Sequence, residues 1–149
     1  SDDIEDDIAD GLYTLEDYSY MVAVMSSEAI GDLEGSVAVG YCVMYRSQKN
    51  HATIKNVVTA PGQFASPWYN YINKPKNDTV HKAAILVLKG EIENPVPECY
   101  FFFSASAVTC FKPGTFHKNV GGNMYYKQWG DVHTKHTDTH YCTKNKNKK

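Results

Sequence analysis

The sequence predicts an α+β domain in which a mainly helical lobe precedes a small antiparallel β-ribbon. Apolar residues recur at intervals of three and four through most of the first 90 residues, which is the period of amphipathic helices. Two aromatic stretches that favour strands, CYFFFSASAV and NMYYKQW, come after Pro95 and Pro97. With 149 residues, 42% of them hydrophobic, the chain suits one domain with one modest core.

The first two helices are expected to meet at a tight corner. Thr14 can cap the first helix together with Asp17 three residues later, in a relative of the capping box. The apolar stripe continues to Ala29, and Gly31 is a suitable C-terminal glycine. A second helix is predicted over residues 33–46, where apolar side chains again share one stripe.

Two shorter helices and the ribbon complete the expected domain. A helix is predicted over residues 52–59, before Pro61 and Gly62. Another is expected to be capped by Asp78 and to end before Gly90. The two aromatic stretches should then pair as antiparallel strands, which gives the α+β class.

The two ends of the chain differ in charge. Residues 1–17 contain eight acids and no base, and residues 1–11 are predicted to be an acidic, flexible lead-in because they bury too little apolar surface to offset ordering. The domain itself is expected over residues 12–130, followed by a polar, lysine-rich tail over 131–149. That tail suits a polyanion such as a teichoic-acid-bearing wall, membrane headgroups or nucleic acid, and a solvated tail explains its composition equally well.

The sequence contains no candidate membrane span. No apolar stretch approaches the roughly 20 residues that cross a bilayer. The first residues are acidic where a signal peptide would be basic and then apolar. Export would therefore require a removed leader, a larger parent protein or lysis of a host cell.

Metal binding is a rival interpretation of one segment. DVHTKHTDTHYC brings together His133, His136, His140 and Cys142, whose side chains are zinc ligands. The threonine-rich segment is a poor helix, and no second ligand pair stands at finger spacing. No metal site is therefore expected, and a metal-dependent enzyme of another class is the alternative. Cys42, by contrast, lies in a helical apolar pattern and is expected in the core.

One carboxylate, Glu28, lies where the neighbouring pattern would bury it. In MSSEAIGDLEG it is three residues beyond Met25 and seven beyond Met21, so it projects beside the apolar stripe of the first helix. Partial removal from water favours the protonated form of a carboxyl group, which suits a general acid. A solvent-facing helix end is the alternative interpretation of the same spacing.

The stretch SEAIGDLEGSVAVGYCVMYR resembles the signature of the SleB-type cell wall hydrolases, the family of spore cortex-lytic enzymes and some phage lysins. In that signature a helix ends in Glu-Ala, a glycine turn follows, and a Glu-Gly pair opens a helix that ends in arginine. Four further blocks resemble the family in order: VVTAPGQFA, HKAAILVLKGEIENP, CYFFFS and VGGNMYY. Together the blocks cover residues 16–127, and their order is more specific than any one of them.

The sequence departs from the family pattern at three places. Ile30 stands where arginine is usual, the turn before Glu34 is one residue short, and Asn123 stands where the last strand usually has histidine. The first two changes affect contacts beside the corner. The third indicates that a polar contact has been exchanged or lost.

The resemblance implies a lysozyme-like fold of the lytic transglycosylase kind and cleavage of the MurNAc–GlcNAc bond of peptidoglycan. Glu28 matches the catalytic glutamate, which would protonate the glycosidic oxygen and then accept the proton of the muramyl 6-hydroxyl. A hydrolytic muramidase would instead need a second carboxylate, roughly 5 Å or 6.5–9.5 Å away. Asp32 and Glu34 are the nearby acids, and Asp32 is better explained as a helix cap. A noncatalytic wall-binding module is a third interpretation.

The resemblance also suggests which residues contact the substrate. The expected set is Glu34, Gln63, Phe64, Tyr100, Phe102, Asn123 and Tyr125. An amide suits sugar hydroxyls or an N-acetyl group, and an aromatic ring suits the C–H face of a sugar. Glu34 is explained equally well as an acid at a helix N-terminus, and Phe102 as ordinary core. Peptidoglycan is the expected partner of a monomer that acts outside the cell or at the wall, with no cofactor, metal or nucleic acid.

Overall fold

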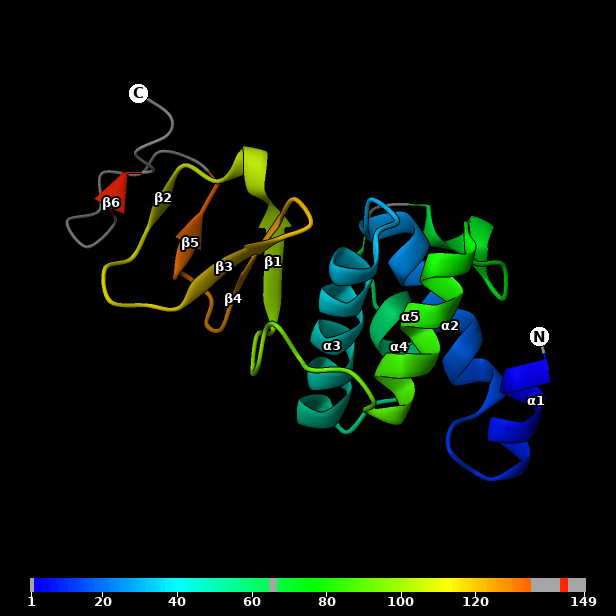
Figure 1. The fold of residues 1–149 in the computed structure, drawn as a ribbon. Helices are drawn as coiled ribbons and strands as arrows, with labels where there is room; N and C mark the ends of the chain where they lie inside the picture. Colours follow the sequence, from blue (N-terminus) through cyan, green and yellow to red (C-terminus); the bar gives the residue numbers. More distant parts are fainter. Residues whose placement is uncertain (1, 65–66, 135–142, 145–149) are drawn as a thin grey trace.

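The computed structural model describes residues 2–64, 67–134 and 143–144. Helices occupy the first part of the chain and two small sheets the second, and α3 is the helix nearest to β1 (Figure 1). The helices are α1 (Asp2–Ala9), α2 (Leu15–Glu28), α3 (Leu33–Asn50), α4 (Ile54–Thr59) and α5 (Asp78–Lys89), with short 3-10 turns at Trp68–Tyr71 and Ala105–Ala107. The strands are β1 (Phe101–Ser104), β2 (Cys110–Phe111), β3 (His117–Val120), β4 (Asn123–Tyr126), β5 (Val132–His133) and β6 (Thr143–Lys144).

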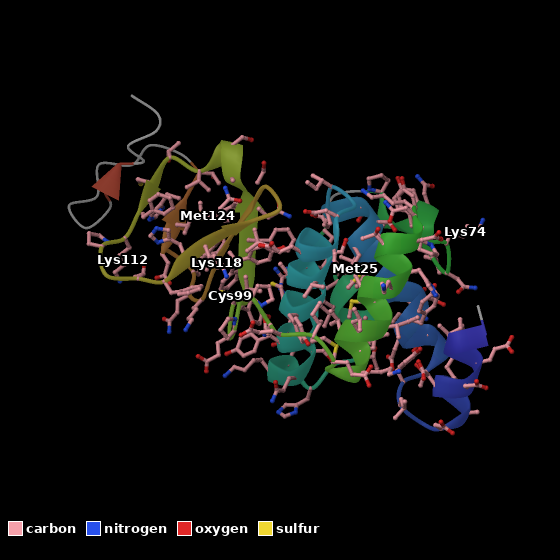
Figure 2. All side chains as sticks on the ribbon, in the orientation of Figure 1. Met25, Lys74, Cys99, Lys112, Lys118 and Met124 are labelled. Atoms are coloured by element: carbon pink, nitrogen blue, oxygen red, sulfur yellow. The ribbon has the colours of Figure 1, made fainter. Side chains whose placement is uncertain are left out.

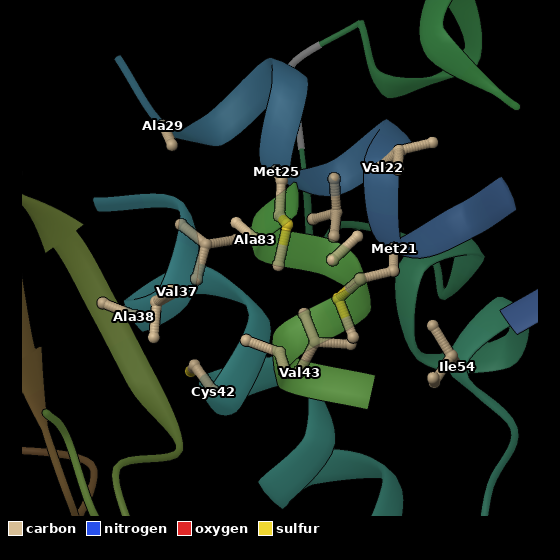
Figure 3. Packing of buried hydrophobic residues seen from close by; sticks show 14 of the residues in the cluster. Met21, Val22, Met25, Ala29, Val37, Ala38, Cys42, Val43, Ile54 and Ala83 are labelled. Carbon is tan, nitrogen blue, oxygen red and sulfur yellow. The ribbon is translucent and has the colours of Figure 1, made fainter. Parts of the chain in front are cut away.

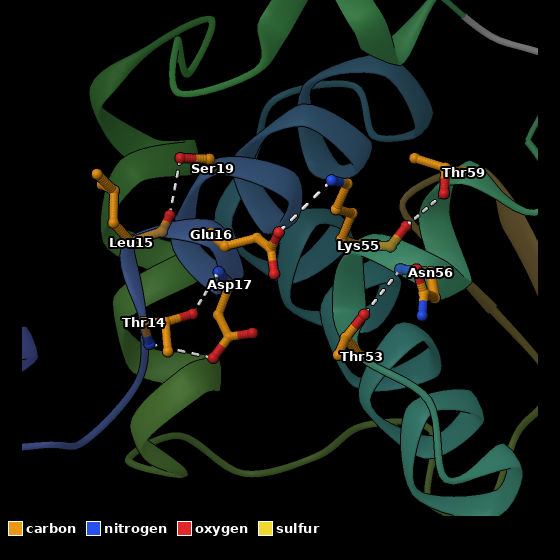
Figure 4. A network of polar contacts seen from close by, with 9 residues as sticks. All are labelled: Thr14, Leu15, Glu16, Asp17, Ser19, Thr53, Lys55, Asn56 and Thr59. Carbon is orange, nitrogen blue, oxygen red and sulfur yellow. Dashed lines mark hydrogen bonds and ion pairs between the residues drawn. The ribbon is translucent and has the colours of Figure 1, made fainter.

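Local capping fixes the starts of the helices. Thr14 and Asp17 form the predicted capping box of α2, with reciprocal hydrogen bonds of 3.0 and 3.1 Å (Figure 4). Thr53 caps α4 in the same picture. The cap of α5 is Asn77 and not the predicted Asp78, since the Asn77 side chain accepts from the N–H of Val80. Asparagine and aspartate both cap helices, so the sequence pattern could not decide between these adjacent residues, and the predicted cap is wrong by one position.

The helix ends are set by backbone geometry. Gly90 ends α5 in the left-handed region, as predicted (φ 66°). The end of α3 was predicted at residue 46, but the helix continues to Asn50 and stops at His51, which is also left-handed. The last turn of α3, residues 47–50, is polar and does not continue the apolar stripe from which the helix was predicted.

The main core lies between α2, α3 and α5. Met21, Met25, Cys42 and Ala83 are all fully buried there, with Met25 packed beside Ala83 (Figure 3). Gly40 allows this close approach, because a Cβ at that position would collide with the side chain of Met25. Figure 2 shows Met25 inside the helical part of the molecule and Met124 on the sheet part. The predicted burial of Cys42 is confirmed.

The N-terminal segment differs from the expected flexible lead-in. Asp2–Ala9 forms α1, and Ile4 and Ile8 pack against the main core. The Asp7 carboxylate accepts a hydrogen bond from the Tyr13 hydroxyl at 2.8 Å and lies 3.4 Å from the Lys89 ammonium. The prediction counted the acids but missed that two isoleucines four residues apart form one apolar stripe, and that Lys89 offsets one of the charges.

The first sheet has the order β1-β4-β3 and is antiparallel throughout. The predicted pairing of the two aromatic stretches is confirmed, with Phe102 opposite Tyr125. These two side chains pack with the helices, whereas Phe101, Phe103 and Tyr126 contact a second, smaller core cluster. Residues adjacent in a strand face opposite sides of a sheet, which accounts for the division. The strand β3 was not predicted, because HKNV is short and mostly polar.

The second sheet has the order β5-β2-β6 and extends past residue 130, where the polar tail was expected to begin. Val132 of β5 is buried beside Tyr126 and Val108 in the second cluster. Among the described residues, no helix combines the length and the apolar character that crossing a bilayer requires.

Candidate active site

The candidate site is the α2–α3 corner, which comprises residues 28–34. Helix α2 ends at Glu28, Ala29 turns the chain into an extended conformation, and Gly31 adopts a φ of 102° that favours glycine. Asp32 then caps α3 by accepting a hydrogen bond from the N–H of Gly35 at 3.1 Å. Local sequence therefore builds the turn that places Glu28 beside the start of α3.

The segment before α5 holds one side of the corner. The Lys76 ammonium donates to the carbonyl oxygen of Ala29 at 2.6 Å, and its backbone N–H donates to the Ser26 hydroxyl at 3.0 Å. The Asn77 amide adds a longer contact to the carbonyl of Gly31, at 3.4 Å. A single dipeptide thus binds the end of α2 and the turn that follows it.

The first sheet holds the other side of the corner. The Asn123 side-chain amide donates to the backbone carbonyl of Glu28 at 3.0 Å. In the turn before β4, Gly121 packs on Gly35 in the first turn of α3, so closely that a Cβ at Gly121 would lie 2.7 Å from the Gly35 Cα. The sheet and α3 therefore meet through backbone contact, next to the catalytic candidate.

The Glu28 carboxylate is half-buried, and its position differs from those of its neighbours. Its Oε2 atom is buried and has no hydrogen-bond partner among the described residues. Asp32 is exposed and occupied as a cap, and Glu34 is exposed in the first turn of α3. Of these three acids, Glu28 alone directs a carboxylate oxygen into the protein. Such an oxygen is removed from water and has no protein donor among the described residues.

Tyr125 lies on the sheet next to this carboxylate. Its side chain is fully buried, and its pKa is raised well above the ordinary value, first by burial and then by the nearby Cys42 thiol. The Glu28 carboxylate raises it further, whereas a contact with the Asn123 amide lowers it. That contact is not a hydrogen bond of ordinary geometry, because the Tyr125 hydroxyl has no such partner among the described residues. The hydroxyl is therefore neutral and able to donate.

A second group of predicted residues gathers around Arg46. The buried Arg46 guanidinium donates to the carbonyl of Tyr100 at 2.6 Å and to the Gln63 side-chain oxygen at 3.2 Å. It also lies over the rings of Phe64 and Tyr100, at 4.9 and 5.2 Å. Gln63 and Tyr100 border a cavity of about 260 Å³ beside Arg46. Phe64, which was expected to offer a ring face to sugar, is itself buried beneath the guanidinium.

A row of rings connects the two groups. Phe64 lies 6.3 Å from Phe102, and Phe102 lies 5.0 Å from Tyr125, between ring centroids. The structure therefore brings together Glu28, Asn123 and Tyr125 at one end, and Tyr100 and Gln63 at the other. Phe102 lies between them as a partly buried core residue.

Sequence reasoning missed three supporting contributions, from Arg46, Lys76 and Gly121. Arg46 was visible as the arginine that ends the signature helix, but its contacts to loop and strand depend on tertiary structure. The contacts of the Lys76 ammonium and of Gly121 are made to backbone atoms, which leave no pattern in sequence. Ile30, at the position of the usual family arginine, is 73% exposed.

The histidine-rich segment is described only at its start. His133 lies in β5, whereas His136, His140 and Cys142 fall outside the described residues. Within the described part of the chain, no group of three or more metal-ligating side chains is gathered.

A helical lobe joined to a small antiparallel sheet, with a carboxylate at a helix corner beside the sheet, is the arrangement of a lysozyme-like fold. Residues 31–141 match the family described as Cell Wall Hydrolase, and the chain belongs to this family. Glu28 lies three residues before the matched range. No curated protein matches the sequence significantly.

Two solved structures share the fold. One is the catalytic domain of the germination-specific lytic transglycosylase SleB from Bacillus anthracis, with a TM-score of 0.63 and 21% identity over 77% of this chain and 97% of that one. The other is the catalytic domain of the Bacillus cereus SleB protein, with a TM-score of 0.61 and 22% identity over 77% and 92%. The predicted α+β, lysozyme-like fold and the resemblance to SleB-type cell wall hydrolases are thereby confirmed.

Proposed function

We propose that this protein cleaves the MurNAc–GlcNAc glycosidic bond of peptidoglycan as a lytic transglycosylase, with Glu28 as the single acid and base. The observation that supports this most directly is the half-buried Glu28 carboxylate, whose inner oxygen lacks a partner among the described residues. Membership of the cell wall hydrolase family supports the polymer, and the SleB structures, one of them named a lytic transglycosylase, support the reaction. The place of action is then the cell wall.

The reaction needs one carboxyl group because the nucleophile belongs to the substrate. Protonated Glu28 gives its proton to the glycosidic oxygen, the bond from that oxygen to C1 of MurNAc breaks, and the GlcNAc side leaves as an alcohol. The Glu28 carboxylate next takes the proton of the muramyl 6-hydroxyl, whose oxygen bonds to C1. The products are a 1,6-anhydro-MurNAc end and a protonated Glu28, ready for another cycle.

Neighbouring residues support this assignment by holding Glu28 in place. Asn123 fixes the backbone of Glu28, and the neutral Tyr125 hydroxyl lies near its carboxylate. Because Tyr125 is fully buried, its hydroxyl is placed to donate to this carboxylate and not to a sugar. Gln63 and Tyr100 border the cavity beside Arg46 and are proposed to contact more distant sugars. Phe64 and Phe102 are proposed to support this surface from below.

A hydrolytic muramidase is the second candidate function. The exposure of the Glu34 carboxylate favours it. This acid is exposed in the first turn of α3, six residues after Glu28, so its carboxylate is accessible to a sugar or a water. Asp32 is less suitable, because its Oδ1 atom already caps α3.

Mass spectrometry of muropeptides released from purified sacculi tests the proposal. We expect anhydromuramyl ends from the wild type and from Glu34→Gln, and a loss of about 10²- to 10⁴-fold in Glu28→Gln. Reducing muramyl ends that disappear in Glu34→Gln would replace the transglycosylase with the muramidase. Release of no product by the wild type, together with sedimentation on sacculi, would mean that the chain is a noncatalytic wall-binding module.

A further inference from the structure

Trp129 is a large aromatic residue that remains outside the core. Its side chain is 74% exposed, although exposure of an indole leaves considerable apolar surface in water. It follows β4, the strand that carries Asn123 and Tyr125. Its ring belongs to the side of the sheet that carries Phe101 and Phe103, whereas Phe102 and Tyr125 face the helices. It therefore contributes to none of the contacts at the α2–α3 corner.

A closed turn presents this tryptophan. The N–H of Asp131 donates to the carbonyl of Gln128 at 3.0 Å, and the Asp131 side chain accepts from the N–H of Gln128 at 3.1 Å. Gly130 takes the third position of the turn with a φ of 96°, which glycine adopts without strain. The Asp131 carbonyl accepts from the N–H of Lys112, which ties the turn to the end of β2. Trp129 thus lies at the tip of a turn held by three hydrogen bonds, two of them between backbone groups.

Two phenylalanines fix the ring itself. The Trp129 indole lies at a steep angle to Phe101 (5.6 Å between ring centroids, 60°) and to Phe103 (6.1 Å, 58°). Both are in turn stacked on the buried ring of Tyr126, at 5.3 and 5.5 Å. An exposed aromatic that is held this way loses little side-chain entropy when it binds a partner.

We propose that Trp129, supported by Phe101 and Phe103, is a second glycan-binding platform that stacks on the apolar face of an N-acetylated sugar. A flat indole with an N–H donor suits a sugar ring, which offers C–H bonds on its faces and hydroxyls at its rim. The platform is too small for a stable protein partner, since one tryptophan side chain contributes about 150–250 Å² against the roughly 800 Å² that each partner usually buries.

The location of the platform fits the polymer of the proposed function, on which this inference rests. Asn123 contacts Glu28, and Trp129 follows it by six residues, so the Cα atoms of the two residues are at most about 22 Å apart. A polysaccharide strand that occupies the α2–α3 corner is long enough to reach this distance. The platform would then hold an insoluble substrate between cleavage events.

Binding to sacculi stripped of teichoic acids provides the test, in a Glu28→Gln background that cannot cleave them under the proposed mechanism. We expect Trp129→Ala to weaken sedimentation binding about tenfold, on the scale of losing one stacked ring. Trp129→Phe should restore most of the affinity, because a ring remains. Leu12→Ala, which removes another exposed apolar side chain near the start of α2, should bind as the parent does. Thermal unfolding of each variant controls for folding.

The outcomes separate this inference from the proposed function. Equal binding by Trp129→Ala and its parent would overturn the platform, whether or not the wild type cleaves sacculi. A weakening that appears only on walls that retain teichoic acids would overturn it as well, because the ligand would then be the phosphate polymer. Weaker binding by Trp129→Ala to stripped sacculi, in a protein whose wild type releases no product, would uphold the platform and reject the catalytic proposal.

Discussion

The Asn123 amide donates a hydrogen bond to the backbone carbonyl of Glu28 at 3.0 Å, and so joins β4 to the end of α2 across 95 positions of sequence. The contact is made to the backbone and not to the carboxylate. It therefore fixes where the acid stands and leaves the carboxyl group free to react. Asn123 is a positioning residue in this arrangement.

We expect Asn123→Ala to lower kcat about ten- to hundredfold with a small change in KM, because the helix end that carries Glu28 loses an anchor. Asn123→His should retain more activity, because an imidazole N–H can donate to the same carbonyl. Asn119→Ala, in the neighbouring strand β3, serves as the control. Steady-state kinetics on solubilised glycan strands measures all three, and equal rates for Asn123→Ala and the wild type would contradict the anchoring.

Paired substitutions test the contact between the sheet and α3. In Gly121→Ala the new Cβ would lie 2.7 Å from the Gly35 Cα, and we expect a loss of about 3 kcal/mol in the free energy of unfolding. Gly122→Ala has the same unfavourable sign of φ but meets nothing within 4 Å, so its loss should be about 1–2 kcal/mol. Urea unfolding of the two variants compares them directly. Equal losses would mean that the close approach to α3 contributes nothing.

Arg46 is expected to be poorly replaced by lysine. Arg46→Lys keeps the charge but cannot donate to the Tyr100 carbonyl and the Gln63 amide while covering the Phe64 ring. We expect a loss of about 2–3 kcal/mol in the free energy of unfolding, since the partly buried Tyr100 carbonyl loses a charged donor. Gln48→Ala, an exposed change on the same helix, should remain within about 0.5 kcal/mol of the wild type. Chemical denaturation provides the values, and a neutral Arg46→Lys would contradict the bridging contacts.

Cys42 should make the fold sensitive to alkali. Burial raises the pKa of its thiol from 9.0 to about 12, so the folded protein retains a proton that the unfolded chain releases at lower pH. The stability from this group is complete below about pH 9 and is lost progressively as the pH rises toward 12. Between pH 7.5 and 10.5 we expect the wild type to lose about 2 kcal/mol more than Cys42→Ala. Parallel losses in urea unfolding would contradict this assignment, and the packing cost of the substitution cancels in the comparison.

Features encoded within a few residues could be predicted from the sequence. The capping box of Thr14 and Asp17, the left-handed Gly90 and the alternation of the aromatic strands all depend on local geometry. These features were sufficient for the α+β fold. The stretches that resemble the SleB-type family in order further predicted how the helices are arranged around the α2–α3 corner.

Features that depend on distant partners could not be predicted. HKNV becomes β3 because β4 provides it with backbone partners, and α1 forms because two isoleucines and Asp7 find contacts in the core and on α5. Asn123 departs from the histidine usual in the family, but its acceptor is a backbone carbonyl, which every residue carries. The sequence could therefore indicate the acid of the site but not the anchors that hold it.

The anchors of the α2–α3 corner enter the chain in a fixed order during synthesis. Glu28 leaves the ribosome long before Lys76, and Lys76 before the turn at Gly121 and the strand that carries Asn123. A nascent chain that already contains Glu28 and Lys76 therefore still lacks the hydrogen bond from Asn123 to the Glu28 carbonyl. Under the proposed function, full activity would appear only when translation has passed β4, so most partial products of synthesis would be poor wall-cleaving enzymes.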